Sequence, residues 1–172
     1  MLENITLIGM PGAGKSTVGH LLAKCLQFEF IDTDKLICQQ QKRTLQSIVN
    51  EDGYMQLRRF EEQAILSIDA KKAVIATGGS VVYSETAMQH LSRLSRIIYL
   101  SVPYEIIEDR IKNLDTRGLV KQAHQSLHEL YVERTALYEK YAEIIVDATL
   151  SAEAVAEKIE AFTTEDTEDT EV

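Results

Sequence analysis

The sequence predicts a three-layer α/β/α sandwich, in which helices cover both faces of a parallel sheet. Short apolar runs alternate with longer helical patterns along the chain, as expected for repeated βαβ units. The first apolar run leads directly into a glycine-rich loop, residues 9–16. The chain has 172 residues, 45% of them apolar, which suits one domain with its own core and leaves little room for a second.

The expected elements follow one another in a regular order. The apolar runs predict strands over residues 5–8, 29–31, 73–76, 97–100 and 144–146. The periodicity between them predicts helices over residues 16–26, 34–41, 45–51, 54–68, 85–94, 104–112, 126–141 and 152–162. Thr44 and Ser151 are expected to cap the helices that follow them, and Gly53 to separate two helices.

Two segments do not fit this alternation. Residues 113–125 carry mixed charges and Gly118 without clear periodicity, so they are either a lid between two helices or a plain solvated connection. Residues 163–172 are acidic and lack core-forming side chains, so we expect a disordered tail. The predicted domain therefore spans residues 1–162.

Composition excludes several classes of function. The net charge is −9, five of the acidic residues lie in the last eight positions, and no basic stripe marks a nucleic-acid surface. Cys25 and Cys38 have no metal-ligand spacing with the histidines, which favours reduced thiols. No apolar run approaches the roughly 18 residues of a membrane span, and a strand begins too early for a signal segment. We expect a cytoplasmic monomer without membrane or nucleic-acid partners.

The loop of residues 9–16 matches the phosphate-loop pattern G-x-x-x-x-G-K-[ST]. Its glycines allow successive N–H groups to turn toward a polyphosphate at the start of a helix. Lys15 would place its charge on the β- and γ-phosphates, and Ser16 would put its hydroxyl on a bridging Mg²⁺. The alternative is a glycine turn before a surface lysine. The strand before the loop and the amphipathic helix after it favour nucleotide binding.

Three further groups of residues bear on the phosphoryl acceptor. Asp32 and Asp34 follow the second strand, where ligands bind in α/β folds, so one could support Mg²⁺ through water and the other accept a proton. Alternatively, Asp34 only caps the next helix. Arg58 and Glu61 share a helix face, which provides either a receptor for a substrate carboxylate or a solvated surface.

The third group is a pair of glycines, Gly78 and Gly79, that ends the third strand. Paired glycines there allow a ligand to approach the backbone closely, or simply make a tight turn.

Together these residues resemble the shikimate kinase family over essentially the whole chain apart from the acidic tail. The shared features are a phosphate loop, Asp-x-Asp, Arg-x-x-Glu, a glycine run, a lid arginine and a late Arg-x-x-Leu-Tyr. They stand here at 9–16, Asp32 with Asp34, Arg58 with Glu61, Gly78 with Gly79, Arg117, and Arg134 to Tyr138. The resemblance implies a P-loop kinase with a five-stranded parallel sheet in the order 2-3-1-4-5.

The resemblance also implies roles for these residues. ATP would be bound by Gly12, Ala13, Gly14, Lys15, Ser16, Thr17, Arg110 and Arg117. Arg110 would lie along the adenine, and Arg117 would reach the phosphates with the lid. Asp34 would bind shikimate hydroxyls and act as or near the base, while Arg58 and Arg134 would hold the carboxylate. Gly78 and Gly79 would lie near the ring, and Ser16 with Asp32, through water, would hold Mg²⁺.

The chain departs from the family pattern at several positions. Ser80 stands where the family usually has a third glycine, and Gly118 stands where the lid usually has proline. Leu57 and Ala136 replace a usual Phe and Pro, and the connection 147–151 is short.

The implied function is ATP-dependent phosphorylation of the 3-hydroxyl of shikimate, a step of aromatic amino-acid biosynthesis. The alternatives are a related kinase acting on another hydroxylated acid of the gluconate or homoserine type, for which Ser80 is the best support, and a catalytically silent nucleotide-binding regulator.

Overall fold

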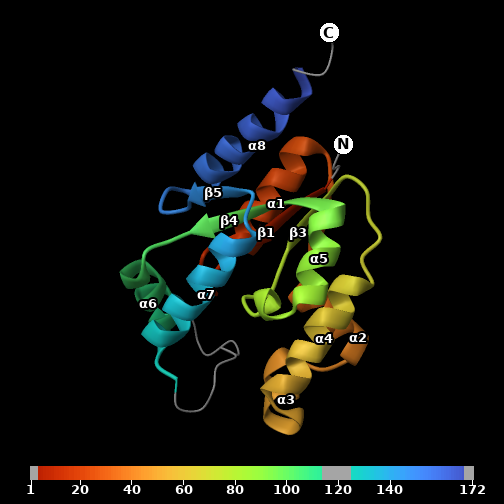
Figure 1. The fold of residues 1–172 in the computed structure, drawn as a ribbon, viewed down its shortest axis with the longest axis vertical. Helices are drawn as coiled ribbons and strands as arrows, with labels where there is room; N and C mark the ends of the chain where they lie inside the picture. The colour runs from red at the N-terminus through yellow and green to blue at the C-terminus, as the bar shows by residue number, and fades with distance from the viewer. Residues whose placement is uncertain (1–3, 114–124, 169–172) are drawn as a thin grey trace.

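The sheet is parallel throughout and has the strand order β2-β3-β1-β4-β5 (Figure 1). The computed structural model describes residues 4–113 and 125–168. Its strands are β1 (Asn4–Ile8), β2 (Glu29–Asp32), β3 (Ala73–Ala76), β4 (Ser95–Ser101) and β5 (Ile144–Asp147). This order agrees with the one that the family resemblance implied.

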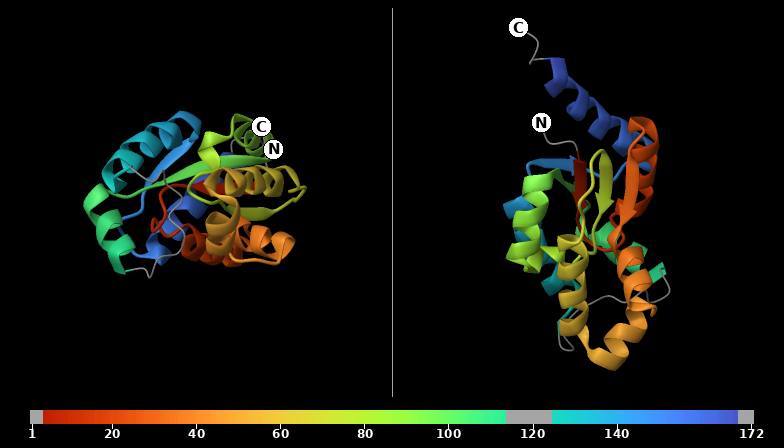
Figure 2. Two further views of the ribbon diagram at one scale, coloured as in Figure 1. Left: turned by 90° about the horizontal axis from the view of Figure 1, so that it is seen from below. Right: turned by 90° about the vertical axis from the view of Figure 1, so that its right-hand side faces the viewer.

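Helices cover both faces of the sheet, which confirms the three-layer prediction (Figure 2). On one face lie α1 (Lys15–Leu26) and α8 (Ala152–Glu168), which contact each other, and on the other lie α5 (Glu85–Leu94) and α7 (Leu127–Tyr141). Three helices form a lobe at one end of the molecule: α2 (Thr33–Gln41), α3 (Leu45–Asp52) and α4 (Tyr54–Leu66). The remaining helices are α6 (Tyr104–Asn113) and the short 3₁₀ turn η1 (Val81–Tyr83).

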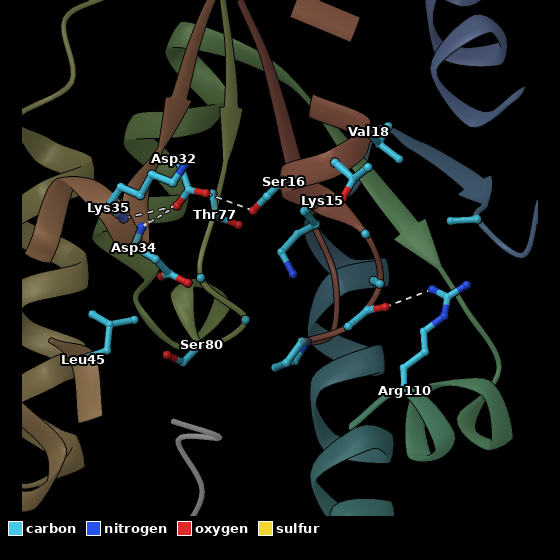
Figure 3. Close-up of a pocket in the computed structure, with 18 of the residues that line it drawn as sticks. Lys15, Ser16, Val18, Asp32, Asp34, Lys35, Leu45, Thr77, Ser80 and Arg110 are labelled. Atoms are coloured by element: carbon cyan, nitrogen blue, oxygen red, sulfur yellow. Dashed lines mark hydrogen bonds between the residues drawn. The ribbon is translucent and has the colours of Figure 1, made fainter. Parts of the chain in front are cut away.

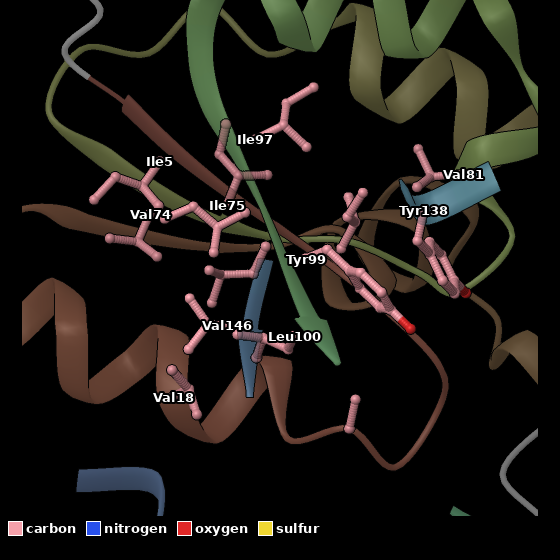
Figure 4. Packing of buried hydrophobic residues seen from close by; sticks show 14 of the residues in the cluster. Ile5, Val18, Val74, Ile75, Val81, Ile97, Tyr99, Leu100, Tyr138 and Val146 are labelled. Atoms are coloured by element: carbon pink, nitrogen blue, oxygen red, sulfur yellow. The ribbon is translucent and has the colours of Figure 1, made fainter. Parts of the chain in front are cut away.

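The core lies around the central strand β1, in which all five residues are buried (Figure 4). A strand between two parallel neighbours and two helix layers has no solvated face, so its polar residues Asn4 and Thr6 are buried with hydrogen-bond partners. Each fully buried Leu, Ile or Val contributes about 1.5–3 kcal/mol of transfer free energy. A second, smaller cluster joins α2, α3 and α4 through Ile37, Ile48, Leu57 and Ala64. The lobe is therefore packed in its own right.

Most predicted elements agree with the structure to within two residues at their ends, with two differences. The turn η1 was not expected. Helix α8 does not end at Phe162 but runs to Glu168, into the segment expected to be disordered. An acidic composition shows that a segment cannot form a hydrophobic core of its own. It does not prevent an existing helix from growing, because each added residue gains a backbone hydrogen bond without a new nucleation step. Residues 169–172 lie outside the described residues.

The predicted caps are present. The Thr44 hydroxyl accepts a hydrogen bond from the Ser47 N–H at 3.1 Å, and the Ser151 hydroxyl accepts one from the Ala154 N–H at 3.3 Å. Of the helices described, none is long and apolar enough to cross a membrane.

Candidate active site

The phosphate loop connects β1 to α1, as the sequence predicts. Gly12 and Gly14 have φ of 80° and 94°, a conformation that residues with side chains rarely adopt. Gly14 is also the N-cap of α1 and makes no side-chain capping bond, so the helix start has no capping side chain in front of it. Free N–H groups at a helix N-terminus attract anions. The local geometry thus suits a polyphosphate.

Lys15 is buried against this loop. Its Nζ donates to the carbonyl oxygens of Gly9 and Met10 at 2.7 and 2.9 Å. Burial lowers the pKa of Lys15 to about 8, with Asp34 acting in the opposite direction. Burial of an ammonium in this position costs free energy, and phosphate oxygens would supply a compensating negative charge.

Asp32 connects the loop to α2. Its Oδ1 accepts hydrogen bonds from the N–H groups of Asp34 and Lys35 at 3.1 and 3.2 Å, so Asp32, rather than Asp34, is the N-cap of α2. Its Oδ2 accepts the Ser16 hydroxyl at 3.0 Å, as Figure 3 shows. The alternative that Asp34 only caps the helix is therefore wrong, and the Ser16–Asp32 pair lies beside the phosphate loop.

Asp34 lines the cavity from the first turn of α2 (Figure 3). Desolvation by the surrounding protein raises the pKa of its carboxyl, and Asp32 adds to that effect while Lys15 opposes it. A carboxylate with a raised pKa is a better proton acceptor than an exposed one. Its position and its electrostatics both suit a general base.

Other parts of the protein approach Gly78 and Gly79 closely, so the two glycines do more than make a tight turn. A Cβ on Gly78 would lie 2.7 Å from Oε1 of Glu61 and 3.0 Å from Oδ1 of Asp34. A Cβ on Gly79 would lie 2.8 Å from Cδ of Pro11 and 3.0 Å from an Nη of Arg134. The Pro11 ring cannot move aside easily, so Gly79 has no room for a side chain, whereas a side chain at Gly78 would displace the Glu61 carboxylate.

Arg134 and Tyr138 lie one turn apart on α7 and both reach the glycine loop. Arg134 is only 1% exposed and lines the cavity. The Tyr138 hydroxyl donates to the carbonyl oxygen of Gly79 at 2.6 Å, and its ring stacks on Tyr99 with centroids 5.1 Å apart. The late Arg-x-x-Leu-Tyr pattern therefore places an arginine in the cavity and anchors the loop beside it.

Arg58 lines a second, smaller pocket of about 210 Å³ that adjoins the main cavity. Its guanidinium carbon lies 3.8 Å from the centroid of the Tyr83 ring. The two pockets share Glu61 and Ser80 in their walls. Arg134 and Arg58, the two arginines predicted to bind the substrate carboxylate, therefore line different pockets that share this wall.

Arg110 of α6 contacts the phosphate loop, donating to the Gly12 carbonyl oxygen at 2.9 Å (Figure 3). Its contact with an adenine stays a prediction. Arg117, Gly118 and the expected lid of residues 113–125 fall, apart from its two ends, outside the described residues. Their roles also stay predictions.

The main cavity has a volume of about 1360 Å³ and brings most of the predicted residues together. The predicted residues that line it are Gly12, Ala13, Gly14, Lys15, Ser16, Thr17, Asp32, Asp34, Gly78, Gly79, Arg110 and Arg134. Within the described part of the chain, no cluster of three or more His, Cys, Asp or Glu side chains could hold a metal alone. A cation here would need phosphate oxygens or water among its ligands.

Sequence reasoning missed two contributors. Tyr83 lies on the unexpected turn η1, and only the packing of α4 and α7 brings the two arginines to it. The hydrogen bond from Ser80 to Glu61 joins residues 19 positions apart.

Comparison with known proteins gives consistent matches. A family model described as shikimate kinase matches residues 11–164. The shikimate kinase of Thermodesulfovibrio yellowstonii is 38% identical over 162 residues, which are 92% of this chain and 93% of that protein. Shikimate kinase 2 of Escherichia fergusonii is 32% identical over 167 residues, 94% of this chain and 92% of that protein.

Solved structures agree with the sequence matches. The shikimate kinase from Acinetobacter baumannii in complex with shikimate superposes with a TM-score of 0.87 at 30% identity. The match covers 96% of this chain and 95% of that one.

Proposed function

The chain belongs to the shikimate kinase family, and from that premise we propose that it transfers the γ-phosphoryl group of ATP to the 3-hydroxyl of shikimate. The observation that carries the proposal is a single cavity that holds a phosphate loop, a buried arginine and a carboxylate with a raised pKa. A donor site and a site for an acidic alcohol are thus adjacent, as transfer between them requires.

On the donor side, the loop N–H groups and Lys15 bind the phosphates of ATP. Lys15 would exchange its contacts with the Gly9 and Met10 carbonyls for phosphate oxygens, which are stronger partners because they are charged. Arg110 supports the loop through Gly12. The contribution of Arg117 to charge neutralisation rests on the family resemblance.

Ser16 and Asp32 are the residues that would hold Mg²⁺, Asp32 through water. Their hydrogen bond already places hydroxyl and carboxylate oxygens side by side next to the loop, and oxygen is the ligand that Mg²⁺ prefers. When bound with ATP, Mg²⁺ neutralises charge on the β- and γ-phosphates.

On the acceptor side, Asp34 accepts the proton of the attacking hydroxyl. Arg134 binds the substrate carboxylate and orients the ring, and Arg58 contributes from the adjoining pocket. Gly78 and Gly79 let Glu61, Asp34 and Arg134 approach the loop closely, because a side chain there would meet them or Pro11, and their place near the ring rests on the family resemblance. The chemistry is then positioning and charge stabilisation, which dominate phosphoryl transfer.

A coupled assay of ADP release tests the function against shikimate, quinate, gluconate and homoserine. We expect shikimate to give by far the highest kcat/KM. Turnover of gluconate or homoserine in preference to shikimate would overturn the acceptor assignment. ATP binding without ADP release on any acid would favour the silent regulator.

A further inference from the structure

Ser80 is a polar residue buried in the wall between the two pockets. It is 3% exposed, and its φ of −97° and ψ of −1° are accessible to any residue, so the backbone does not demand glycine here. Its hydroxyl donates a hydrogen bond to Oε2 of Glu61. The hydroxyl that could have contacted an acceptor is therefore committed to a carboxylate of the protein, although Ser80 lines the cavity (Figure 3).

Charged groups from two other helices, α2 and α7, and from α4 itself act on Glu61. Asp34 of α2 approaches Gly78 from the same side as Glu61, and Arg134 of α7 approaches the next glycine. Arg58 lies one turn earlier on α4 itself, and Lys15 of α1 faces Asp34. Glu61 is thus a carboxylate in the wall shared by the two pockets, one lined by Arg134 and the other by Arg58.

The ionisation of Glu61 is closely balanced. Burial raises the pKa of Glu61 to about 7, and Asp34 raises it further, while the Ser80 hydroxyl, Arg134 and Arg58 lower it. A donor that bonds to a carboxylate stabilises its charged form. Removing the Ser80 hydroxyl therefore favours the protonated form of Glu61 near neutral pH.

A negative charge on Glu61 would reduce the repulsion between Arg58 and Arg134. Arg58 and Arg134 both reach the Tyr83 ring, at 3.8 and 5.5 Å from its centroid, so two like charges lie in one small region. Like charges in a partly buried site repel unless an anion lies near both. An ionised Glu61 supplies that anion, because the charges of both arginines act on its carboxyl.

We propose that Ser80 is a positioning residue for the acceptor: its hydroxyl holds the Glu61 carboxylate in place, so that Glu61 keeps Arg58 and Arg134 oriented toward the acceptor carboxylate. The inference rests on the proposed function, because it takes the acceptor to be an acid held by these arginines. Ser80 touches no reacting atom and acts through Glu61 alone.

The test is the pH dependence of shikimate binding without nucleotide, measured by calorimetry from about pH 5.5 to about pH 9. We expect binding to the parent protein to weaken on acidification, as Glu61 takes up a proton. In Ser80→Ala the weakening should begin about one pH unit higher, so that the Kd near pH 7 rises by up to about tenfold while the values near pH 9 agree. Ser80→Gly should behave like Ser80→Ala, and Ser80→Thr should restore the parent curve.

Steady-state kinetics add a second readout. In Ser80→Ala the KM for shikimate should follow the Kd, while kcat at saturation and the KM for ATP stay unchanged. A fall in kcat with an unchanged KM for shikimate would overturn the proposal, because it would place Ser80 in the chemical step.

Ser84→Ala is the matched control, since Ser84 donates a hydrogen bond to Glu62, the neighbouring residue on α4. Ser84 also caps α5, so this variant should lose thermal stability and leave the pH curve of shikimate binding unmoved. The proposal fails if Ser80→Ala and Ser80→Gly, like this control, change only the melting temperature.

A wrong assignment of the acceptor would give a different result from a wrong role for Ser80. In that case the parent protein neither binds nor phosphorylates shikimate at any pH and uses another acid. The same pH series run with that acid then still decides whether Ser80 acts through Glu61.

Discussion

Arg58 packs face-on against Tyr83, with its guanidinium carbon 3.8 Å from the ring centroid. Arg134 reaches the same ring at 5.5 Å, so one aromatic side chain on a short turn connects α4 with α7. The Arg58 Nε has no hydrogen-bond partner in the described part of the chain, and the guanidinium carbon also lies 5.3 Å from the centroid of the Tyr54 ring. The acceptor arginines are therefore placed by aromatic packing as well as by charge.

Replacing Tyr83 should weaken acceptor binding selectively. Tyr83→Leu removes the ring face and should cost about 1–2 kcal/mol in shikimate binding, the range of partly desolvated cation–π contacts, while the KM for ATP stays constant. Tyr83→Phe keeps the ring and should bind shikimate nearly as the parent does. Equal losses in both variants, measured by calorimetry, would show that the hydroxyl and not the ring supports the arginines.

Arg134→Ala should weaken shikimate binding by about 2–5 kcal/mol, because the substrate carboxylate would lose its buried partner. Arg58→Ala should act in the same direction. Arg59→Ala is the control, since Arg59 is the exposed neighbour of Arg58 on α4. If Arg134→Ala binds shikimate and a carboxamide analogue of it as the parent protein does, the carboxylate is held elsewhere.

Lys15→Met should reduce turnover by at least about a hundredfold to a thousandfold, the loss typical of removing one charge-stabilising donor. The melting temperature should not fall, because burial of the ammonium already costs free energy and lowers its pKa to about 8. Lys24→Met changes an exposed lysine of the same helix and should leave activity unchanged. Turnover near that of the parent would remove this loop from the mechanism.

Asp34→Asn should lower kcat by about 10²–10⁴ with ATP still bound, because the amide keeps the shape of the side chain but accepts no proton. Measuring kcat and KM separately decides its role. A rise in the KM for shikimate at unchanged kcat would make Asp34 a binding group and not the base.

Glu61→Gln should stabilise the fold in a pH-dependent way. The pKa of Glu61 rises from an ordinary value of 4.5 to about 7 on burial, so between these values the folded chain holds a proton that the unfolded chain has released. The free energy of unfolding contributed by this group therefore falls as the pH rises from about 4.5 to about 7. Urea unfolding should show Glu61→Gln to be more stable by about 2–3 kcal/mol at pH 8, with most of that gain lost at pH 5. An equal gain at both pH values would contradict the buried charge.

The sequence by itself determined the fold class, the phosphate loop and most element boundaries. These depend on local patterns: the alternation of apolar and helical runs, glycines at fixed spacing before Lys15 and Ser16, and capping residues such as Thr44. Helix α8 is the instructive exception, because acidic composition excludes a core but does not stop a helix that already exists.

Only the tertiary structure decided how the acceptor side is built. The approach of Glu61 and Asp34 to Gly78 and the hydrogen bond from Ser80 to Glu61 join residues far apart in the chain. The packing of α4, α7 and η1 likewise brings both arginines to Tyr83. Hydrogen bonds and charge interactions act over a few ångströms and depend on direction, so no local pattern specifies them until the helices pack.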